Sequence, residues 1–408
     1  MKNNKFVRVI RTKKYKDINL YLRFSVENKN NNLEKICLLS KMIGDISKKY
    51  PTKVEMTACR DMLYGISCDC SYKSTVNLVT LSVHYTFINP RFVDATISEY
   101  NSFIKETLFN SIIDENSLKE AKTTISASIT RDNDKPAYLS KEIFVEIVGK
   151  DNKDFMNYSR GDKFINNLKK VKLDSLIEMY KFIINKAQLN VYLCGDLTDD
   201  DINQLVTYRF DNRLPVNIMT HRVKYNKKRK IVDTKPISQT YLSIVYSTPF
   251  SKKHKEYFSW MMGNYLLGIG PASLLFNEIR EKMSLCYSIN SQAYKQEGLV
   301  RIATSIDAKN VDIAIKQIMA QVDRICKKDY DPKQLENTKS YVIDAFKAIN
   351  DDIDSLIDFY FDNDLSNMDY SIEEFCEKLN SVTVDDISRV YKKYVPYFNH
   401  VLLGSKHE

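Results

Sequence analysis

Apolar and polar residues alternate along several short segments of the chain, a pattern typical of β-strands with one buried face. The clearest alternation in the first half lies at 17–26 and 76–87, and in the second half at 238–246 and 298–306. Further strands are predicted at 65–70, 190–195, 284–294 and 399–404. The pattern therefore predicts two groups of strands, one in each half of the chain.

Apolar residues at helical spacing occupy most of the remaining chain. In the first half they predict helices at 33–48, 92–110, 116–131, 137–148 and 173–184. In the second half they predict helices at 254–267, 273–281, 309–327, 332–349, 352–364, 371–380 and 384–394. Because strands come first and a run of helices follows in each half, we expect an α+β fold.

A helix followed by a strand recurs after about 210 residues. Residues 173–181 and 384–392 both begin with an apolar residue and Asp, and both end in Tyr-Lys. A strand ending in Gly follows each, at 190–195 and 399–404. This period is far longer than that of a solenoid repeat and indicates a duplication. We predict an N-terminal lobe over 1–211, a linker over 212–234 and a C-terminal lobe over 235–408.

The composition is that of a globular protein. Hydrophobic residues make up 43% of the 408 residues and charged residues 28%, which excludes a largely disordered or fibrous chain. Apolar runs stay below the roughly 18 residues of a membrane span, and the N-terminal residues lack the apolar core of a signal peptide. We therefore expect no membrane span and a cytoplasmic location.

The net charge of +9 is mild for this length, and much of it is local. Six Lys or Arg residues fall within 221–230. Such a run can bind nucleic acid or phosphates, or it can be a solvated linker. Because the run lies between the two similar halves, we interpret it as a linker and expect no nucleic-acid partner.

The eight cysteines are expected to be reduced thiols, since the chain lacks an export signal. Cys68 and Cys70 form a single C-x-C pair, which is not a four-ligand zinc framework. The histidines, at 84, 221, 254, 400 and 407, are isolated from one another. For His84, a structural role in its strand is favoured over a ligand role.

One segment of the second half combines several features that carry chemistry. A Gly/Pro turn, a capping Ser273 and an amphipathic helix lead to Arg280, and a strand containing Tyr287 follows. An Arg and a Tyr that lie seven residues apart across a turn can both donate hydrogen bonds to the same oxygen atom. In the structural alternative, Arg280 caps the last helical carbonyls and Tyr287 packs in the sheet. Cys286 is expected to be an inert thiol, because no motif supplies it with a base.

The sequence Leu-Phe-Asn-Glu-Ile-Arg-Glu-Lys-Met-Ser-Leu-Cys-Tyr at 275–287 resembles the C-terminal motif of the M16 (insulinase/pitrilysin-like) metallopeptidases. The family pattern, L-F-x-x-[LI]-R-x-K-x-x-L-x-Y, is met at every defined position. The resemblance includes the duplication and implies two lobes of the LuxS/mitochondrial-processing-peptidase type, each a mostly antiparallel sheet flanked by helices. It also implies that Arg280 and Tyr287 hold the scissile carbonyl of a substrate peptide.

Catalytic members of the family carry His-x-x-Glu-His on the first long helix, where it binds zinc and supplies the general base. This motif is absent from the chain. The resemblance places Cys37, Ser40 and Lys41 at the motif's positions and Ser128 near the downstream Glu ligand. Lys41 would bring a positive charge beside a cation, so we expect no metal and no catalytic residue on this chain alone.

The resemblance therefore implies an inactive subunit of a heterodimeric zinc peptidase. Within the family, several segments are similar to YmfF-type subunits, which are paired with a YmfH-type zinc subunit carrying His-x-x-Glu-His. Zinc is then expected on the partner, and a peptide is the expected substrate. One alternative is a scaffold or binding protein of M16 fold with no proteolytic role. A second alternative, a nucleic-acid binder, would act through 221–230.

Overall fold

The computed structural model describes residues 6–208, 213–220, 222–223 and 229–405. It divides into two compact units. The first contains 1–132 and 157–217, and the second contains 133–156 and 218–408. Residues 133–156 thus belong to the second unit, whereas the sequence-based division assigned them to the N-terminal lobe. Residue 212, His221, residues 224–228 and His407, which enter the predictions above, lie outside the described residues.

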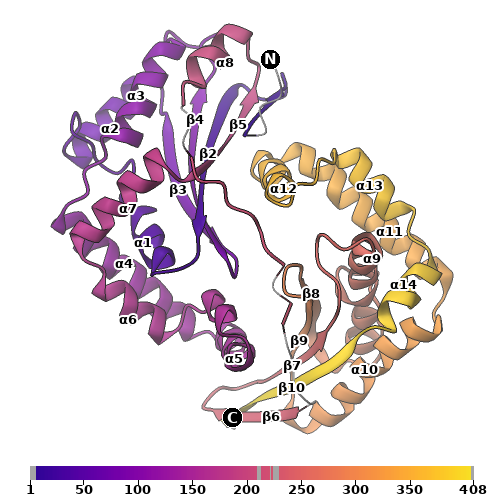
Figure 1. Ribbon diagram of the computed structural model, residues 1–408. Coiled ribbons are helices and arrows are strands. Elements are labelled where there is room, and N and C mark those ends of the chain that lie inside the picture. Colours follow the sequence, from indigo (N-terminus) through magenta and orange to yellow (C-terminus); the bar gives the residue numbers. More distant parts are fainter. Residues whose placement is uncertain (1–5, 209–212, 221, 224–228, 406–408) are drawn as a thin grey trace. The chain divides into compact units, whose positions relative to one another are not determined.

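The first unit is built on a five-stranded sheet with the order β1-β5-β2-β4-β3 (Figure 1). Its strands are β1 (Val7–Arg11), β2 (Asp17–Glu27), β3 (Ser67–Ser74), β4 (Leu78–Ile88) and β5 (Gln188–Gly195). β1 pairs with β5 in parallel, and the other pairs are antiparallel. The predicted mostly antiparallel sheet is therefore confirmed for this unit.

Helices flank this sheet, with α1, α3 and α7 along one of its faces (Figure 1). The α-helices of the unit are α1 (Asn32–Leu39), α2 (Lys53–Met62), α3 (Ile97–Phe109), α4 (Glu115–Asn133), α6 (Asp162–Lys170), α7 (Leu173–Asn185) and α8 (Asp199–Leu205). A short 3-10 helix, η1 (Lys153–Tyr158), precedes α6. The sequence pattern missed α2, α6 and α8.

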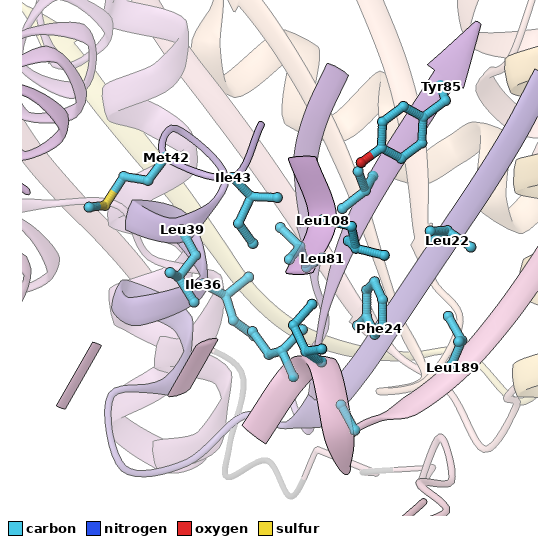
Figure 2. Close-up of a cluster of buried hydrophobic side chains, with 14 of the residues drawn as sticks. Leu22, Phe24, Ile36, Leu39, Met42, Ile43, Leu81, Tyr85, Leu108 and Leu189 are labelled. Carbon is cyan, nitrogen blue, oxygen red and sulfur yellow. The ribbon is translucent and has the colours of Figure 1, made fainter. Parts of the chain in front are cut away.

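The core of the first unit lies between β2 and the helices. Leu22 and Phe24 are almost fully buried there against side chains of α1, as Figure 2 shows. The opposite face of β2 is polar but also buried, rather than exposed as strand alternation predicts. Tyr21 stacks on His84 with ring centroids 3.8 Å apart, and His84 Nε2 lies 2.9 Å from the Asn19 side-chain oxygen. His84 thus has the structural role that the sequence analysis favoured.

The predicted helix over 33–48 ends at Leu39 in the structure. The Ser40 hydroxyl donates to the Cys37 carbonyl at 2.8 Å, which competes with continued helical bonding. Gly44 then adopts a φ of 77°, in the left-handed region. The chain turns there and enters α2, which a Thr52–Glu55 capping box begins.

The second unit repeats the sheet of the first, with the order β6-β10-β7-β9-β8. Its strands are β6 (Arg229–Lys235), β7 (Thr240–Ser247), β8 (Cys286–Tyr294), β9 (Leu299–Ile306) and β10 (Val395–Gly404). β6 pairs with β10 in parallel, and the other pairs are antiparallel. The identical order confirms the duplication, with β5 and β10 in equivalent places. β6 includes 229–234, which the sequence analysis treated as the end of a linker.

The other described α-helices lie in the second unit. They are α5 (Pro136–Asp151), α9 (Tyr257–Gly268), α10 (Val311–Lys327), α11 (Pro332–Ala348), α12 (Ile353–Leu365), α13 (Ile372–Asn380) and α14 (Val384–Tyr391). A π-helix, η2 (Phe276–Lys282), and two 3-10 turns, η3 (Ala308–Asn310) and η4 (Ile349–Asp351), complete it. Within the described part of the chain, no helix is long and apolar enough to cross a bilayer.

Helix α5 packs on the sheet of the second unit, opposite the main helical layer. Leu242 and Ile244 of β7 point into the core beneath α9, so Ser243 between them faces the other way. Arg301 of β9 donates to Ser243 at 2.9 Å and to Ser140 of α5 at 3.2 Å. These contacts explain why 133–156 belong to the second unit.

Candidate functional site: the arginine and tyrosine of η2 and β8

Arg280 lies in η2, a turn of wide helix, and not in a regular α-helix. Ser273 opens this segment as predicted, since its hydroxyl oxygen lies 3.4 Å from the Phe276 amide. At the other end the Met283 amide donates to the Glu278 carbonyl, five residues back, at 3.2 Å. Ser284 then adopts a φ of 50°, which stops the helix and turns the chain into β8. The turn gives Arg280 a fixed position immediately before the strand that carries Tyr287.

The guanidinium group of Arg280 lies at the surface of the second unit. Its side chain is 42% exposed and stacks over the ring of Phe276, with 4.5 Å from the guanidinium carbon to the ring centroid. Its Nε lies 3.5 Å from the Glu281 carboxylate, a weak exposed contact. Among the described residues no hydrogen bond joins this side chain to a helical carbonyl, so the structure gives no support to a capping role.

Tyr287 lies on β8, at the free edge of the sheet. A bulge between Cys286 and Ile289 interrupts the pairing of β8 with β9 at this point. The Tyr287 side chain is 84% exposed, so it does not pack in the sheet as the structural alternative requires. An exposed aromatic side chain with a hydroxyl group, beside an irregular edge strand, is well placed to contact another chain.

Arg280 and Tyr287 lie on two elements that pack against each other, η2 and β8. The Cys286 thiol, next to Tyr287, lies close enough to Arg280 that the positive charge of the guanidinium group affects its pKa. Burial raises the pKa of Cys286, while a hydrogen bond with Thr304 and the Arg280 charge oppose that rise. A raised pKa disfavours the thiolate, so Cys286 fits the inert thiol that the sequence predicts.

Neighbouring charges are held in ion pairs that do not involve Arg280. Glu278 binds Lys282 at 2.9 Å and Arg324 at 3.3 Å. Burial opposes ionisation of Glu278, but these two cations lower its pKa overall. The network ties η2 to α10 and pairs Lys282 and Arg324 with one carboxylate, Glu278, to which Arg280 is not bound. The sequence motif gave no indication of the role of Arg324.

The positions that resemble the zinc motif do not fit a zinc ion. Cys37 is 2% exposed, and burial raises its pKa although the Tyr72 hydroxyl hydrogen-bonds to it. Ser40 is committed to the Cys37 carbonyl, Lys41 is exposed beyond the end of α1, and Ser128 is half-buried on α4. None of these side chains is a carboxylate or an imidazole, the ligand types that such a catalytic site needs.

The described histidines also have other partners. His254 accepts a hydrogen bond from the Glu256 amide at 3.1 Å, and His400 lies 3.0 Å from the Asp233 carboxylate. Across the described ranges no three His, Cys, Asp or Glu side chains are grouped so that they could hold a metal ion. Arg280 and Tyr287 therefore remain the candidate site residues among those that the structure describes.

Comparison with known proteins shows which family this chain is similar to. The model of the "Peptidase M16 inactive domain" matches residues 170–342. The chain is 22% identical over 412 residues to the "Probable inactive metalloprotease YmfF" of Bacillus subtilis, and this match covers 98% of the chain and 95% of the relative. The match spans both units, so the similarity is not limited to the segment around the motif.

Solved structures share the fold. A conserved protein from Enterococcus faecalis superposes with a TM-score of 0.88 at 20% identity, covering 98% of this chain and 97% of that chain. A peptidase M16 inactive domain from Pseudomonas fluorescens gives a TM-score of 0.77 at 17% identity, with the same coverage. The two-unit α+β architecture is therefore that of M16 proteins.

Proposed function

Because the chain belongs to the M16 peptidase family and is related to its inactive members, we propose that it is the noncatalytic, substrate-binding subunit of a heterodimeric zinc peptidase. In this proposal the partner is an M16 subunit that carries His-x-x-Glu-His and the zinc ion. This chain supplies Arg280 and Tyr287 to the peptide that the partner cleaves.

The observation that carries the proposal is the exposure of Arg280 and Tyr287. A purely structural arginine and tyrosine would be packed or paired within the fold. Here the guanidinium group stacks over the Phe276 ring but its one polar contact is a weak ion pair at 3.5 Å, and the tyrosine side chain is 84% exposed. Both groups donate hydrogen bonds, and both are available to a second molecule.

The chemistry of these two donors suits a carbonyl oxygen. When water attacks a peptide carbonyl, negative charge develops on its oxygen, and fixed donors aimed at that oxygen lower the barrier. Arg280 would supply charge, and Tyr287 would supply a neutral O–H. Zinc, when bound in the partner, would supply the activated water. The residues of this chain would bind the peptide, orient its carbonyl group and stabilise the developing charge.

The edge position of β8 supports binding of an extended peptide. An edge strand has main-chain N–H and C=O groups that can pair with an added strand. Ser288, Asn290 and Gln292 of β8 are exposed. Their uncharged polar side chains bring no charge repulsion to an approaching peptide. A peptide paired with β8 would place one of its carbonyl groups next to Tyr287.

The test begins with the tagged chain purified from its native cell, followed by mass spectrometry of its partners. We expect a stoichiometric M16 subunit with His-x-x-Glu-His. The purified pair is then assayed for cleavage of a peptide library. We expect Arg280→Ala to lower kcat/KM by about 100-fold, the loss typical of one oxyanion donor, and Tyr287→Phe to lower it less.

The matched control is Lys282→Ala, which removes an exposed cation two residues away that binds Glu278. It should leave kcat/KM nearly unchanged, and all three variants should still bind the partner. Equal cleavage by wild type and both site variants would refute the role of Arg280 and Tyr287. A partner without the zinc motif, or a pair that cleaves no peptide, would favour the scaffold alternative.

A further inference from the structure

Strand β3 of the first unit carries two cysteines whose role neither the fold nor the proposed function explains. Cys68 and Cys70 are alternate residues of the strand, so their thiols leave the same face of the sheet. That face packs against the core of the unit, and both side chains are half-buried. The C-x-C pair thus forms a small dithiol surface at the edge of the sheet, since β3 is the last strand.

The turn after α1 fits closely around this pair. The Cys70 Sγ lies 3.4 Å from the Ile43 carbonyl oxygen. A Cβ atom added at Gly44 would lie 2.5 Å from the Cys68 Sγ, so only glycine leaves room for that sulfur atom. Both sulfur atoms therefore lie against one peptide unit, Ile43–Gly44, which positions them together on the same side of β3.

Arg60 of α2 brings a positive charge to the dithiol. Its Nη2 donates to the Gly44 carbonyl at 2.8 Å, which fixes the guanidinium group beside the turn. Its Nε is buried and has no hydrogen-bond partner in the structure. A guanidinium group held there compensates a negative charge on the sulfur atoms.

The surroundings of the two thiols affect their acidity differently. The neighbouring Cys70 thiol lowers the pKa of Cys68 against the effect of burial, and the Arg60 charge adds to this. The neighbouring Cys68 thiol, together with burial, raises the pKa of Cys70 well above its ordinary value.

We propose that Cys68 and Cys70 form a two-coordinate binding site for a single thiophilic monovalent cation of the Cu(I) class. Soft thiolate ligands select such cations. On binding, both S–H bonds break, two sulfur–metal bonds form and two protons leave to solvent. No electron is transferred. The bound site keeps one negative charge, which Arg60 already compensates.

The strand geometry favours a bridging cation over a disulfide. β3 pairs with β4 without interruption from Ser67 to Ser74, so it is fully extended through both cysteines. Two residues of an extended strand span about 6.6 Å, at the far end of the Cα separation of about 4.4–6.8 Å that a disulfide allows. A cation between the sulfur atoms needs no such approach. Zinc is disfavoured because the described residues offer no third ligand beside the pair.

The test uses the full chain, reduced and without oxygen. Ag(I) serves as a redox-inert probe, and Cu(I) is added from a chromophoric competitor that reports its affinity. We expect one cation bound per chain by native mass spectrometry. Cys68→Ser and Cys70→Ser should each weaken binding by about 100-fold or more, and Arg60→Met by about 10-fold, the scale of an outer-shell partner. Cys59→Ser, on α2, is the matched thiol control and should bind as wild type.

A second measurement on the wild-type chain does not depend on the folding of variants. Bound Ag(I) should protect Cys68 and Cys70 from alkylation, while Cys59 remains reactive. The proposal is overturned if Cys68→Ser and Cys70→Ser bind Ag(I) like the wild type, or if protection falls on other cysteines. It is also overturned if the chain binds Zn(II) as tightly as Cu(I), or if the pair forms a disulfide with peroxide and takes up no Ag(I).

Discussion

Replacing Phe144 by Ala is the sharpest test of the architecture, because this residue belongs to the first half of the sequence and to the second unit of the structure. Its side chain is fully buried. Its ring lies 5.6 Å from that of Phe155, 5.3 Å from that of Tyr294 and 6.3 Å from that of Phe398. The Arg301 guanidinium lies over the same ring at 5.0 Å.

The expected loss in the free energy of unfolding can be calculated from these contacts. Truncation of a buried Phe to Ala costs about 3–5 kcal/mol. The Phe144 ring has three aromatic neighbours and a cation over its face. Each such contact contributes about 0.5–1.5 kcal/mol in addition to the burial of apolar surface, so the cost should lie toward the upper end of this range. We expect about 4–5 kcal/mol. That is a large fraction of the roughly 5–15 kcal/mol by which a folded domain is stable.

The assay is amide hydrogen exchange with chemical unfolding alongside it. Phe144→Ala should reduce protection in β7 and β10 of the second unit and leave β2 and β4 of the first unit protected. The control is Phe92→Ala, which truncates a ring that is 58% exposed and should cost under about 1 kcal/mol. Loss of protection in β2 and β4 instead, or a loss no greater than the control's, would refute the assignment of α5 to the second unit.

Two further predictions concern the second unit. Burial lowers the pKa of His400 despite the nearby Asp233 carboxylate, so below about pH 6.5 the unfolded chain binds a proton that the folded chain does not. The free energy of unfolding should therefore fall as the pH drops through that value, and His400→Gln should flatten the slope in denaturant titrations at pH 5–7. Gly298 has a φ of 69°, and an added Cβ would lie 2.6 Å from the Thr248 carbonyl oxygen. Gly298→Ala should lower Tm by more than Gly65→Ala, whose φ is 77° with open space around it; equal shifts would mean that the backbone contact is not tight.

The duplication and most strands could be predicted from the sequence because alternation and helix–strand order are local signals. Helix α2 could not, because only Met56 among its residues is buried, so it lacks an apolar face. The place of α5 also escaped prediction. Its apolar spacing shows that it packs against something, but Ser140 and Phe144 contain no information about which of two similar sheets receives them.

The motif around Arg280 could be located from the sequence, but its geometry could not. The widening of the helix at η2 depends on where Ser284 turns the chain, which no residue preference specifies. The same limit applies to the dithiol of β3. Strand alternation places Cys68 and Cys70 on one face, while the contact of Gly44 with Cys68 joins positions 24 residues apart in the chain. Such long-range contacts decide whether a motif becomes a site.

At the positions that resemble the zinc motif, the backbone as well as the side chains is unsuited to a zinc ion. Two histidines four residues apart bind one ion when a continuous helix presents them on one face. Here α1 ends at Leu39, and the Lys41 amide bonds to the Leu38 carbonyl in a tight turn at 3.0 Å. A histidine at position 41 would therefore leave the helix axis in another direction from one at Cys37.

The positive charge near Cys37 also disfavours binding of a zinc ion. The Arg160 guanidinium lies over the Tyr72 ring, 5.7 Å from its centroid, and its positive charge acts on the Cys37 thiol. We therefore predict that the fourfold variant Cys37→His, Ser40→Glu, Lys41→His and Ser128→Glu gains no tight zinc binding. Zinc competition with a chelator, in a Cys68→Ser background that removes the dithiol, measures this directly. Binding in the nanomolar range or tighter would show that α1 can extend to position 41, and that ligand loss alone, rather than the local backbone and Arg160, had removed the metal.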